Sequence, residues 1–287
     1  DYWRTQLADA EVLELPTDRP RPQVQSFRGA SEAFRMETRL SRQIETFSQE
    51  QGVTPFMTLL AGFQFLLSRY SRQEDVVVGA GIANRNRIET ERLIGFFVNM
   101  LVIRTKLAGD PTVGQLLQRV QDVCLGAYAH QDVPFEKLVE QLQPERDLAR
   151  EPLFQVAVVM QNFPLRQQAL PGGLQVEPLP MEFVISKYDL TLFLWEGEQL
   201  SGNLEYNTDL FDQETIRQLL TQYQRLLEQL VAQPQARLSS LTLVDQAQRE
   251  RLDKLHYGTT GPPARELLPS QIDHWAHHTP QALAVCD

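Results

Sequence analysis

Residues 97–107 read FVNMLVIRTKL, and this stretch decides the class of fold. Its apolar side chains alternate along the chain, with Val98, Met100 and Val102 opposite Phe97, Leu101 and Ile103. A repeat of two residues is the period of a β-strand. We therefore expect a strand over 97–107, with sheet partners on both sides of it in the sequence.

Five further segments have the pattern of strands. The alternation of apolar and charged residues from Ala33 to Leu40 predicts a half-buried strand, and Val76-Val77-Val78 predicts a short buried one. Downstream, strands are expected over 153–160, 188–195 and 200–207. Helical segments lie between these strands, so the sequence predicts an α/β (α+β) fold.

The helices upstream of residue 97 are marked by their caps. Ser41 is the expected cap of a helix that ends at Gly52, and Thr54 is the expected cap of the next one. Pro55 would occupy the first turn of that second helix, where a missing N–H costs nothing. Residues 56–67 are apolar nearly all round, which is typical of a helix buried in a large domain.

Three helices are expected downstream. Thr112 with Gln115 has the form of a capping box, and a short helix should follow Pro134. Asp212 is expected to cap a long amphipathic helix that Pro234 ends. The pattern therefore predicts one domain over 1–234.

The remaining residues have a different character. Residues 235–265 are polar and rich in glycine and proline, which is typical of an interdomain linker. A helix near 267–278 and a strand near 282–286 then begin an incomplete second domain over 266–287. Because both ends lack the polar character of ordinary termini, we expect a piece of a longer polypeptide.

Composition excludes several classes of function. The net charge is -10 and no basic run is present, which argues against nucleic-acid binding. No apolar stretch reaches the roughly 18–20 residues of a membrane helix. Cys124 and Cys286 are too few and too far apart for a disulfide framework or a zinc site, so a reducing cytoplasm is the expected setting.

Two motifs suggest chemistry that their context does not support. Val78-Gly79-Ala80-Gly81 follows a strand, but Asn84 stands where a dinucleotide fingerprint needs glycine or alanine. His277-His278 are neighbours on a helix and so do not share a face, and no other metal ligand stands at a suitable spacing. We interpret these two histidines, with His256 and His274, as solvated surface.

A polar corner at His130-Gln131-Asp132 lies between two helices. The helix C-terminal dipole would favour His130, and Asp132 would cap the following helix. Composition alone supports this structural interpretation of the corner.

Three segments in register carry a resemblance to a known family. Ile94 to Asn99 with Arg104 resembles the fifth core motif of condensation domains of nonribosomal peptide synthetases. His130 to Glu136 resembles the sixth motif, and Arg146 to Val156 resembles the seventh. In the last, Ala149 and Glu151 replace the usual serine and asparagine. The segments 186–190 and 205–211 add to the resemblance, which covers about residues 1–250, and the tail resembles the start of an adenylation domain.

The resemblance implies the C-terminal lobe of a chloramphenicol-acetyltransferase-like fold, with a mixed sheet flanked by helices. Such a lobe meets an N-terminal lobe at a tunnel, where the amine of one carrier-bound substrate attacks the thioester of another. The family's catalytic His-His-x-x-x-Asp-Gly motif belongs to the N-terminal lobe, so no catalytic residue is expected in this chain, and alone it should be inactive. The candidate tunnel or structural residues are Asn99, His130, Asp132, Arg146, Gln155, Ser186, Asp189, Tyr206 and Asn207.

The implied partners are the upstream and downstream peptidyl carrier domains, the chain's own adenylation domain and the N-terminal lobe. Phosphopantetheine would be carried by the carrier domains, and ATP and Mg would serve only a complete adenylation domain. For Asn99 we expect capping of backbone groups where two elements meet, because buried polar groups need partners. The alternatives are an epimerization domain of the same fold, a non-catalytic module that recruits carrier proteins, and a free-standing acyltransferase.

Overall fold

A computed structural model describes residues 1–85, 88–91, 93–143, 147–161, 185–197, 199–257 and 268–281. The chain divides into two compact units, Asp1–Leu243 and Val244–Asp287. The first unit contains all the described strands and most of the buried apolar side chains.

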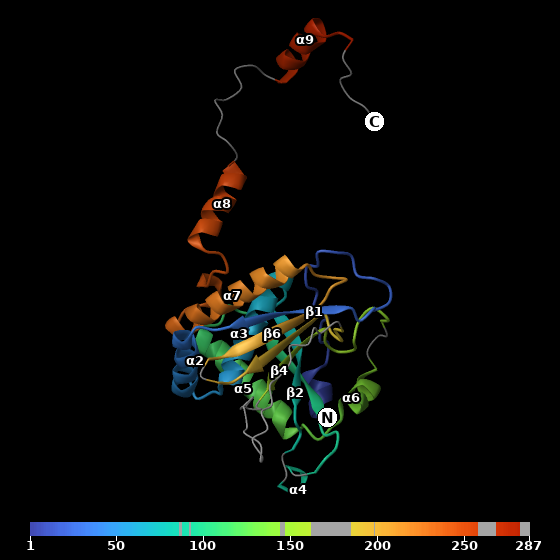
Figure 1. The fold of residues 1–287 in the computed structure, drawn as a ribbon, viewed down its shortest axis with the longest axis vertical. Helices are drawn as coiled ribbons and strands as arrows, with labels where there is room; N and C mark the ends of the chain where they lie inside the picture. Colours follow the sequence, from blue (N-terminus) through green and yellow to red (C-terminus); the bar gives the residue numbers. More distant parts are fainter. Residues whose placement is uncertain are drawn as a thin grey trace, which may run out of the picture. The chain divides into compact units, whose positions relative to one another are not determined.

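A six-stranded mixed sheet forms the centre of the first unit (Figure 1). Its order is β1-β6-β5-β4-β2-β3. Strands β2, β4 and β5 run parallel to one another, while β1, β6 and β3 pair antiparallel with their neighbours. The bounds are β1 Gly29–Arg35, β2 Asp75–Ile82, β3 Asn99–Lys106, β4 Val156–Gln161, β5 Leu190–Trp195 and β6 Ser201–Asn207.

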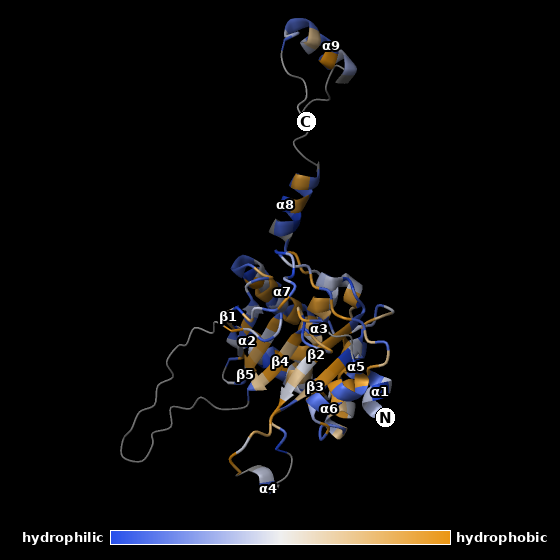
Figure 2. Ribbon diagram, turned by 90° about the vertical axis from the view of Figure 1, so that its right-hand side faces the viewer, coloured by the Kyte–Doolittle hydropathy of each residue, from blue (hydrophilic) through white to orange (hydrophobic). Residues whose placement is uncertain are grey.

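Four helices pack on one face of this sheet: α2 (Thr38–Glu50), α3 (Pro55–Ser71), α5 (Val113–Ala129) and α7 (Gln213–Ala232). The α7 side chain Tyr223 meets the ring of Phe34 from β1 edge-on, and its hydroxyl donates to the Leu59 carbonyl at 2.9 Å. Figure 2 shows the apolar colour concentrated on the strands and on the helices beside them. The mixed sheet flanked by helices confirms the predicted fold class.

The predicted caps of α3 and α5 are confirmed. The Thr54 hydroxyl accepts from the Met57 N–H at 3.2 Å, and Pro55 is the first residue of α3. Thr112 and Gln115 form the expected capping box at the start of α5. The cap of α7 is different, because Asp212 holds the N-cap position but its carboxylate pairs with Arg19 instead of the helix.

The strand predicted from Ala33 to Leu40 is placed too late in the chain. β1 ends at Arg35 and α2 begins at Thr38, so the apolar Leu40 lies in the first turn of a helix. Ser41 is therefore inside α2, where its hydroxyl donates to the Glu37 carbonyl and accepts from the Leu200 N–H. The helix period is 3.6 residues rather than 2, but Leu40 happens to be buried in α2, so the apparent alternation runs across the boundary.

The second face of the sheet carries side chains from alternate positions of the same strands. Cross-strand pairing aligns Ala157, Thr191, Glu205 and Ser31 in one row and Val159, Phe193, Asn203 and Ala33 in the next. A third row holds Gln161, Trp195, Ser201 and Arg35. We call these twelve residues the open face, because α2, α3, α5 and α7 lie on the other side.

Three shorter helices complete the first unit, together with its final residues. They are α1 (Tyr2–Gln6), α4 (Ile88–Glu91) and α6 (Phe135–Leu142). The sequence placed residues 235–243 in a linker, but they lie in the first unit, where Leu238 and Leu241 are buried beside a 3-10 turn over Leu238–Ser240. The Leu238 N–H donates to the Pro111 carbonyl at 3.0 Å, which fixes this stretch to the start of α5.

The described part of the second unit contains two helices, α8 (Gln246–Tyr257) and α9 (Leu268–His278). The strand expected near 282–286 lies outside the described residues. In α9 the predicted helix is found, and His274, His277 and His278 are exposed on it. Within the described ranges, the molecule holds no helix that is long and apolar enough to cross a membrane.

Candidate functional site

Asn99 stands at the carboxyl end of β2, where it begins β3 opposite Ile82. Its side-chain amide donates to the carbonyls of Gln131 at 3.0 Å and Val133 at 2.9 Å, and its oxygen accepts from the Phe135 N–H at 3.0 Å. Both ends of this buried amide are thus used to fix the corner between α5 and α6. Its expected capping of backbone groups is found.

His130 and Asp132 lie at the same corner but differ in how they are held. His130 Nδ1 lies 2.9 Å from the Gly126 carbonyl, and its ring stacks on Tyr2 with 4.1 Å between centroids. Asp132 is exposed, and the N-cap of α6 is Pro134, which makes no side-chain cap. The prediction that Asp132 caps this helix is wrong, because Asn99 already accepts from the first N–H of the helix.

A second group of predicted residues gathers at the amino end of β4 and β5. We call Gln155, Ser186, Asp189 and Asn207 the edge cluster; all four are buried. The Asp189 N–H donates to the Gln155 carbonyl at 2.9 Å, and the Asn207 N–H donates to the Asp189 carbonyl at 3.0 Å. These bonds join three strand ends and bring together four of the nine candidate residues.

The carboxylate of Asp189 is held by an arginine that sequence reasoning missed. Both terminal nitrogens of Arg21 bond to it, and one of them also donates to the Ala149 carbonyl at 3.2 Å. The side chain of Asp189 is only 5% exposed, so the ion pair is nearly dry. Because both carboxylate oxygens are occupied, Asp189 is a fixed structural anion in this arrangement.

Ser186 and Gln155 differ in how well their side chains are satisfied. The Ser186 hydroxyl donates to the Tyr188 carbonyl at 2.7 Å. Gln155 donates to the Glu151 carbonyl at 3.0 Å, but its buried Oε1 has no hydrogen-bond partner. An unpartnered buried acceptor is unusual in a folded protein and often lies where a ligand or water binds.

Two of the predicted residues remain, and one of them faces the other side of the sheet from the open face. Tyr206 pairs with Leu190 and Ala30 on the helix-covered side of the sheet, where burial and the nearby Glu32 raise its pKa. Arg146 lies outside the described residues.

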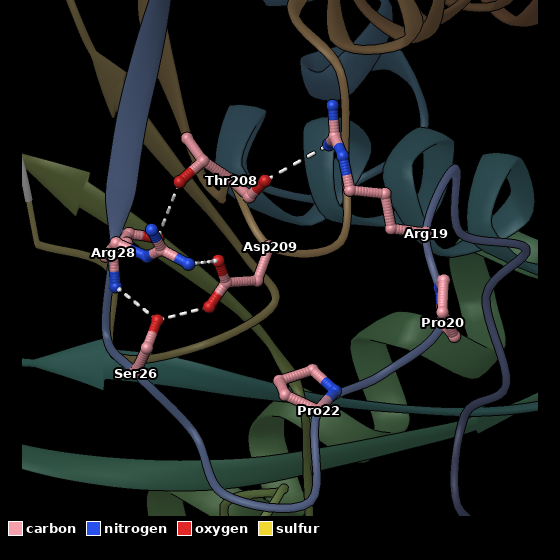
Figure 3. Close-up of a pocket in the computed structure, with 7 residues that line it drawn as sticks. All are labelled: Arg19, Pro20, Pro22, Ser26, Arg28, Thr208 and Asp209. Atoms are coloured by element: carbon pink, nitrogen blue, oxygen red, sulfur yellow. Dashed lines mark hydrogen bonds and ion pairs between the residues drawn. The ribbon is translucent and has the colours of Figure 1, made fainter.

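A hollow of about 660 Å³ adjoins the edge cluster (Figure 3). Arg19 and Arg28 line it, but each of these arginines pairs with a carboxylate, Asp212 for Arg19 and Asp209 for Arg28. Figure 3 shows the guanidinium of Arg28 directed at Asp209, and Ser26 bonds to the same carboxylate. The positive charges are therefore neutralised within the protein, which disfavours an anion site.

Arg104 fastens the first helix to the sheet. Its guanidinium bonds to both oxygens of Asp75, at 3.0 Å from Nε and 2.6 Å from Nη2, and to the carbonyls of Gln6 and Ala8. The bond with Asp75 is the main cause of a raised pKa of Arg104. This residue of the fifth motif is thus an architectural tie.

The residues before β3 expose large apolar side chains. Leu93, Ile94, Phe96 and Val98 are all more than half exposed, and Ile94 and Phe96 almost completely so. We call these four residues the 93–98 patch. Phe97 alone turns inward, under the guanidinium of Arg85 at 4.3 Å. A contiguous exposed apolar segment of this kind marks a surface that another protein element covers.

Metal and thiol chemistry find no support in the described part of the chain. No group of three or more ligating side chains occurs there. Cys124 is buried inside α5, and burial raises the pKa of its thiol to about 12. Gly79, from the apparent dinucleotide motif, lies within β2, and a side chain there would collide with the ring of Phe154.

The fold and the sites together define a class of protein. A mixed sheet has helices on one face, an open second face, two fixed polar clusters at opposite ends and an exposed apolar segment before β3. Comparison with known proteins gives the family: the condensation-domain model matches residues 1–253. The chain belongs to the condensation-domain family, whose members are acyltransferase-type domains that form peptide bonds.

Individual relatives agree with this assignment. The chain is 45% identical over 289 residues to one of the proteins of the linear gramicidin synthase of Brevibacillus parabrevis, matching 99% of this chain and 6% of that protein. A crystal structure of a four-domain nonribosomal peptide synthetase bound to AMP and glycine matches 85% of this chain and 20% of its own, with a TM-score of 0.80 and 27% identity.

A complex of the X-domain and OxyB from teicoplanin biosynthesis also resembles this chain. The match has a TM-score of 0.77 and 30% identity, and it covers 85% of this chain and 55% of that one. The chain therefore spans a small part of the synthetase relatives and about half of this smaller solved chain. The activity of the whole protein thus remains a matter for proposal.

Proposed function

We propose that this chain is the C-terminal lobe of a condensation domain in an elongation module of a nonribosomal peptide synthetase. In that role it joins a carrier-bound acyl or peptidyl thioester to a carrier-bound aminoacyl amine by amide formation. The observation that carries the proposal is the 93–98 patch, which exposes four apolar side chains, three of them within the segment that resembles the fifth condensation motif. The N-terminal lobe of the same domain is the element proposed to cover it.

The histidine content of the first unit supports a division of labour between two lobes. His130 is the one histidine in residues 1–243, and it is tied to the Gly126 carbonyl and stacked on Tyr2. The base that assists amide formation would then come from the other lobe. The contribution of this lobe is positioning, since orienting two tethered substrates can lower the barrier by about 7–11 kcal/mol.

The two fixed clusters have different proposed roles. The corner between α5 and α6 would fix the position of the tunnel wall. It contains Asn99, His130 and Asp132. Gln155, Ser186, Asp189, Tyr206 and Asn207, with Arg146, would form or support the wall near the substrate. The unpartnered Gln155 Oε1 supports a substrate-facing role for this second group.

The second unit is proposed to be the linker and the start of the adenylation domain. This assignment rests on the resemblance of residues 266–287 and on the separation of the chain after Leu243. It implies upstream and downstream peptidyl carrier domains as partners and phosphopantetheine on those carriers. It also implies ATP and Mg at the complete adenylation domain, and a reducing cytoplasm as the setting.

The test uses the intact synthetase with carrier domains loaded with substrate, and mass spectrometry to detect the amide product. Replacing Ile94 and Phe96 together by aspartate should abolish condensation while adenylation of the free amino acid continues. His277→Asp/His278→Asp is the matched control, because it also places two aspartates at exposed sites, here on α9. Undiminished amide formation by the Ile94/Phe96 variant would refute the proposal, as would amide formation by residues 1–287 alone.

A second candidate function is a non-catalytic module that recruits partner proteins. It is favoured by the similarity to the X-domain that was solved in complex with OxyB. In that case the intact protein would bind loaded carriers but yield no amide product in the same assay. The matched family model favours condensation over the epimerization alternative.

A further inference from the structure

The open face carries a group of polar side chains that lie next to the edge cluster and share only Ser186 with it. Strand pairing places Thr191, Glu205 and Ser31 side by side in one row, and Asn203 stands two residues from Glu205 on the same face of β6. Ser186 lies against Gly29, which stands two residues before Ser31 on β1. We call Ser31, Ser186, Thr191, Asn203 and Glu205 the open-face polar cluster.

Two members of this cluster contain buried atoms without a partner. Thr191 is 4% exposed and its hydroxyl makes no hydrogen bond, and the same is true of the buried Oδ1 of Asn203. On the helix-covered face, by contrast, Thr105 donates to Gln64 at 2.9 Å, and Ser48 bonds to Thr58 at 2.7 Å. Native proteins satisfy nearly all buried polar groups, so two neighbouring exceptions on one face mark a place where a polar ligand can bond.

The chemistry of the cluster defines what it can bind. Asn203 Oδ1 and the Glu205 carboxyl are acceptors, and the Thr191 hydroxyl can both donate and accept. Burial raises the pKa of Glu205, although the nearby Ser186 hydroxyl opposes that shift. A ligand must therefore supply N–H or O–H donors in surroundings that disfavour an isolated charge.

The spacing of the acceptor atoms further restricts the kind of ligand that can bind. Asn203 and Glu205 are alternate residues of one strand, so their side chains leave the sheet about 7 Å apart. In an extended peptide the amide N–H groups that point the same way belong to alternate residues, so they recur at the same interval of about 7 Å. The neighbouring Phe193, which is paired with Asn203, would cover the apolar carbons between the amides.

We propose that the open-face polar cluster binds the secondary amides of an extended chain. Asn203 and Glu205 accept from two amide N–H groups that point the same way along the chain, and the Thr191 hydroxyl bonds a carbonyl beside them. This inference rests on the proposed function, in which two sources offer that chemistry: the pantetheine arm and the acyl or peptidyl group that it carries.

The experiment uses the intact synthetase with the double variant Thr191→Val/Asn203→Leu. Three thioester substrates are compared: an acetyl-pantetheine thioester, a dipeptidyl N-acetylcysteamine thioester and an acetyl N-acetylcysteamine thioester. If the cluster binds the arm, the KM of the first should rise about tenfold with kcat nearly unchanged. If it binds the acyl group, the KM of the second should rise instead. The third, which lacks a run of amides, should change little.

Stability measurements separate binding from folding. Thr191→Val alone should leave the melting temperature unchanged or raise it, since it removes an unpartnered hydroxyl. Thr105→Val, on the helix-covered face, is the matched control and should lower the melting temperature without changing any KM. Equal KM values for wild type and the double variant with all three substrates would overturn the proposal.

The binding inference can also be tested apart from condensation. Equilibrium binding of free pantetheine and of a dipeptide amide to the intact protein requires no amide formation. If wild type binds either probe and the double variant binds it about tenfold more weakly, the cluster is a site even where no condensation product forms. If condensation occurs but neither binding nor KM depends on the cluster, the proposed function survives and this inference fails.

Discussion

The two faces of the central sheet differ in whether their buried polar atoms have hydrogen-bond partners. On the face beneath α2, α3, α5 and α7, Thr105 bonds to Gln64, and the Tyr223 hydroxyl bonds to the Leu59 carbonyl. On the open face, Thr191 and Asn203 are left with unpartnered buried atoms. The same six strands supply both faces, so the contrast arises from what each face packs against.

This contrast suggests how to separate architecture from function within one fold. Where every buried polar atom has a partner, a substitution should be felt as lost stability. Where a buried polar atom has no partner, it adds nothing to the stability of the fold, and we look for its role in binding a ligand. Asn99 belongs to the first kind despite its place in a family motif, because its amide makes three bonds to the chain.

The largest effect is expected from a cavity beneath the helices. Ile103 is fully buried on the helix-covered face, so Ile103→Ala should lower the free energy of unfolding by about 4 kcal/mol. Val159→Ala, on the half-buried open face, should cost about 1 kcal/mol. Urea denaturation followed by circular dichroism measures both. Equal losses would mean that the open face is packed as tightly as the covered one.

The next largest effect concerns the buried charge beside the open face. Arg21→Leu leaves the carboxylate of Asp189 without its partner and should cost about 3 kcal/mol. The double variant Arg21→Leu/Asp189→Leu should recover much of that loss, because no isolated charge remains. Unfolding of the two variants in urea gives the comparison. A double variant as unstable as the single one would show that the ion pair itself stabilises the fold.

A matched pair of threonines tests the comparison directly. Thr105→Val should cost about 1–2 kcal/mol, because it leaves the buried Gln64 oxygen without its donor. Thr191→Val should change the free energy of unfolding by less than about 0.5 kcal/mol, or increase it. If the two substitutions destabilise equally, the contrast between the faces is not real.

The smallest effect is a dependence on pH. Burial raises the pKa of Glu205, so its ionised form is disfavoured in the folded protein, and stability falls as pH rises through that raised pKa. Glu205→Gln removes this term and should raise the melting temperature by roughly 1–3 °C at pH 8. The gain should vanish below the ordinary pKa of glutamate, where both states are protonated. Calorimetry at several pH values measures this gain in melting temperature. A gain that persists at low pH would contradict the account.

Much of the fold could be read from local patterns. The capping box at Thr112, the proline at the start of α3 and the apolar stripe of α7 are short-range signals, and all three describe the structure. The boundary between β1 and α2 was missed, because alternation does not show where a strand stops. The burial of Leu238 and Leu241 was missed as well, since two leucines in a polar stretch give no periodicity.

The sites were harder to predict, because they depend on segments far apart in the chain. Only the family resemblance named the residues of the edge cluster as candidates: Gln155, Ser186, Asp189 and Asn207. Arg21 was not singled out, since an arginine between two prolines carries no local sign that it will meet a carboxylate 168 residues later. Asp132 was predicted to cap α6 because it lies just before that helix in the sequence. In the structure Asn99, at the start of β3, accepts from the first N–H of the helix instead.

The pairing of the first strand with the last has a consequence for how the chain is made. β1 can complete its ladder only when β6 exists, about 180 residues further along. At typical rates of synthesis, this leaves the β1 edge without its partner for roughly 10–35 s on the ribosome. During that interval an exposed strand edge is a site of mispairing with other chains. Slower translation or depleted chaperones should therefore reduce the yield of folded protein.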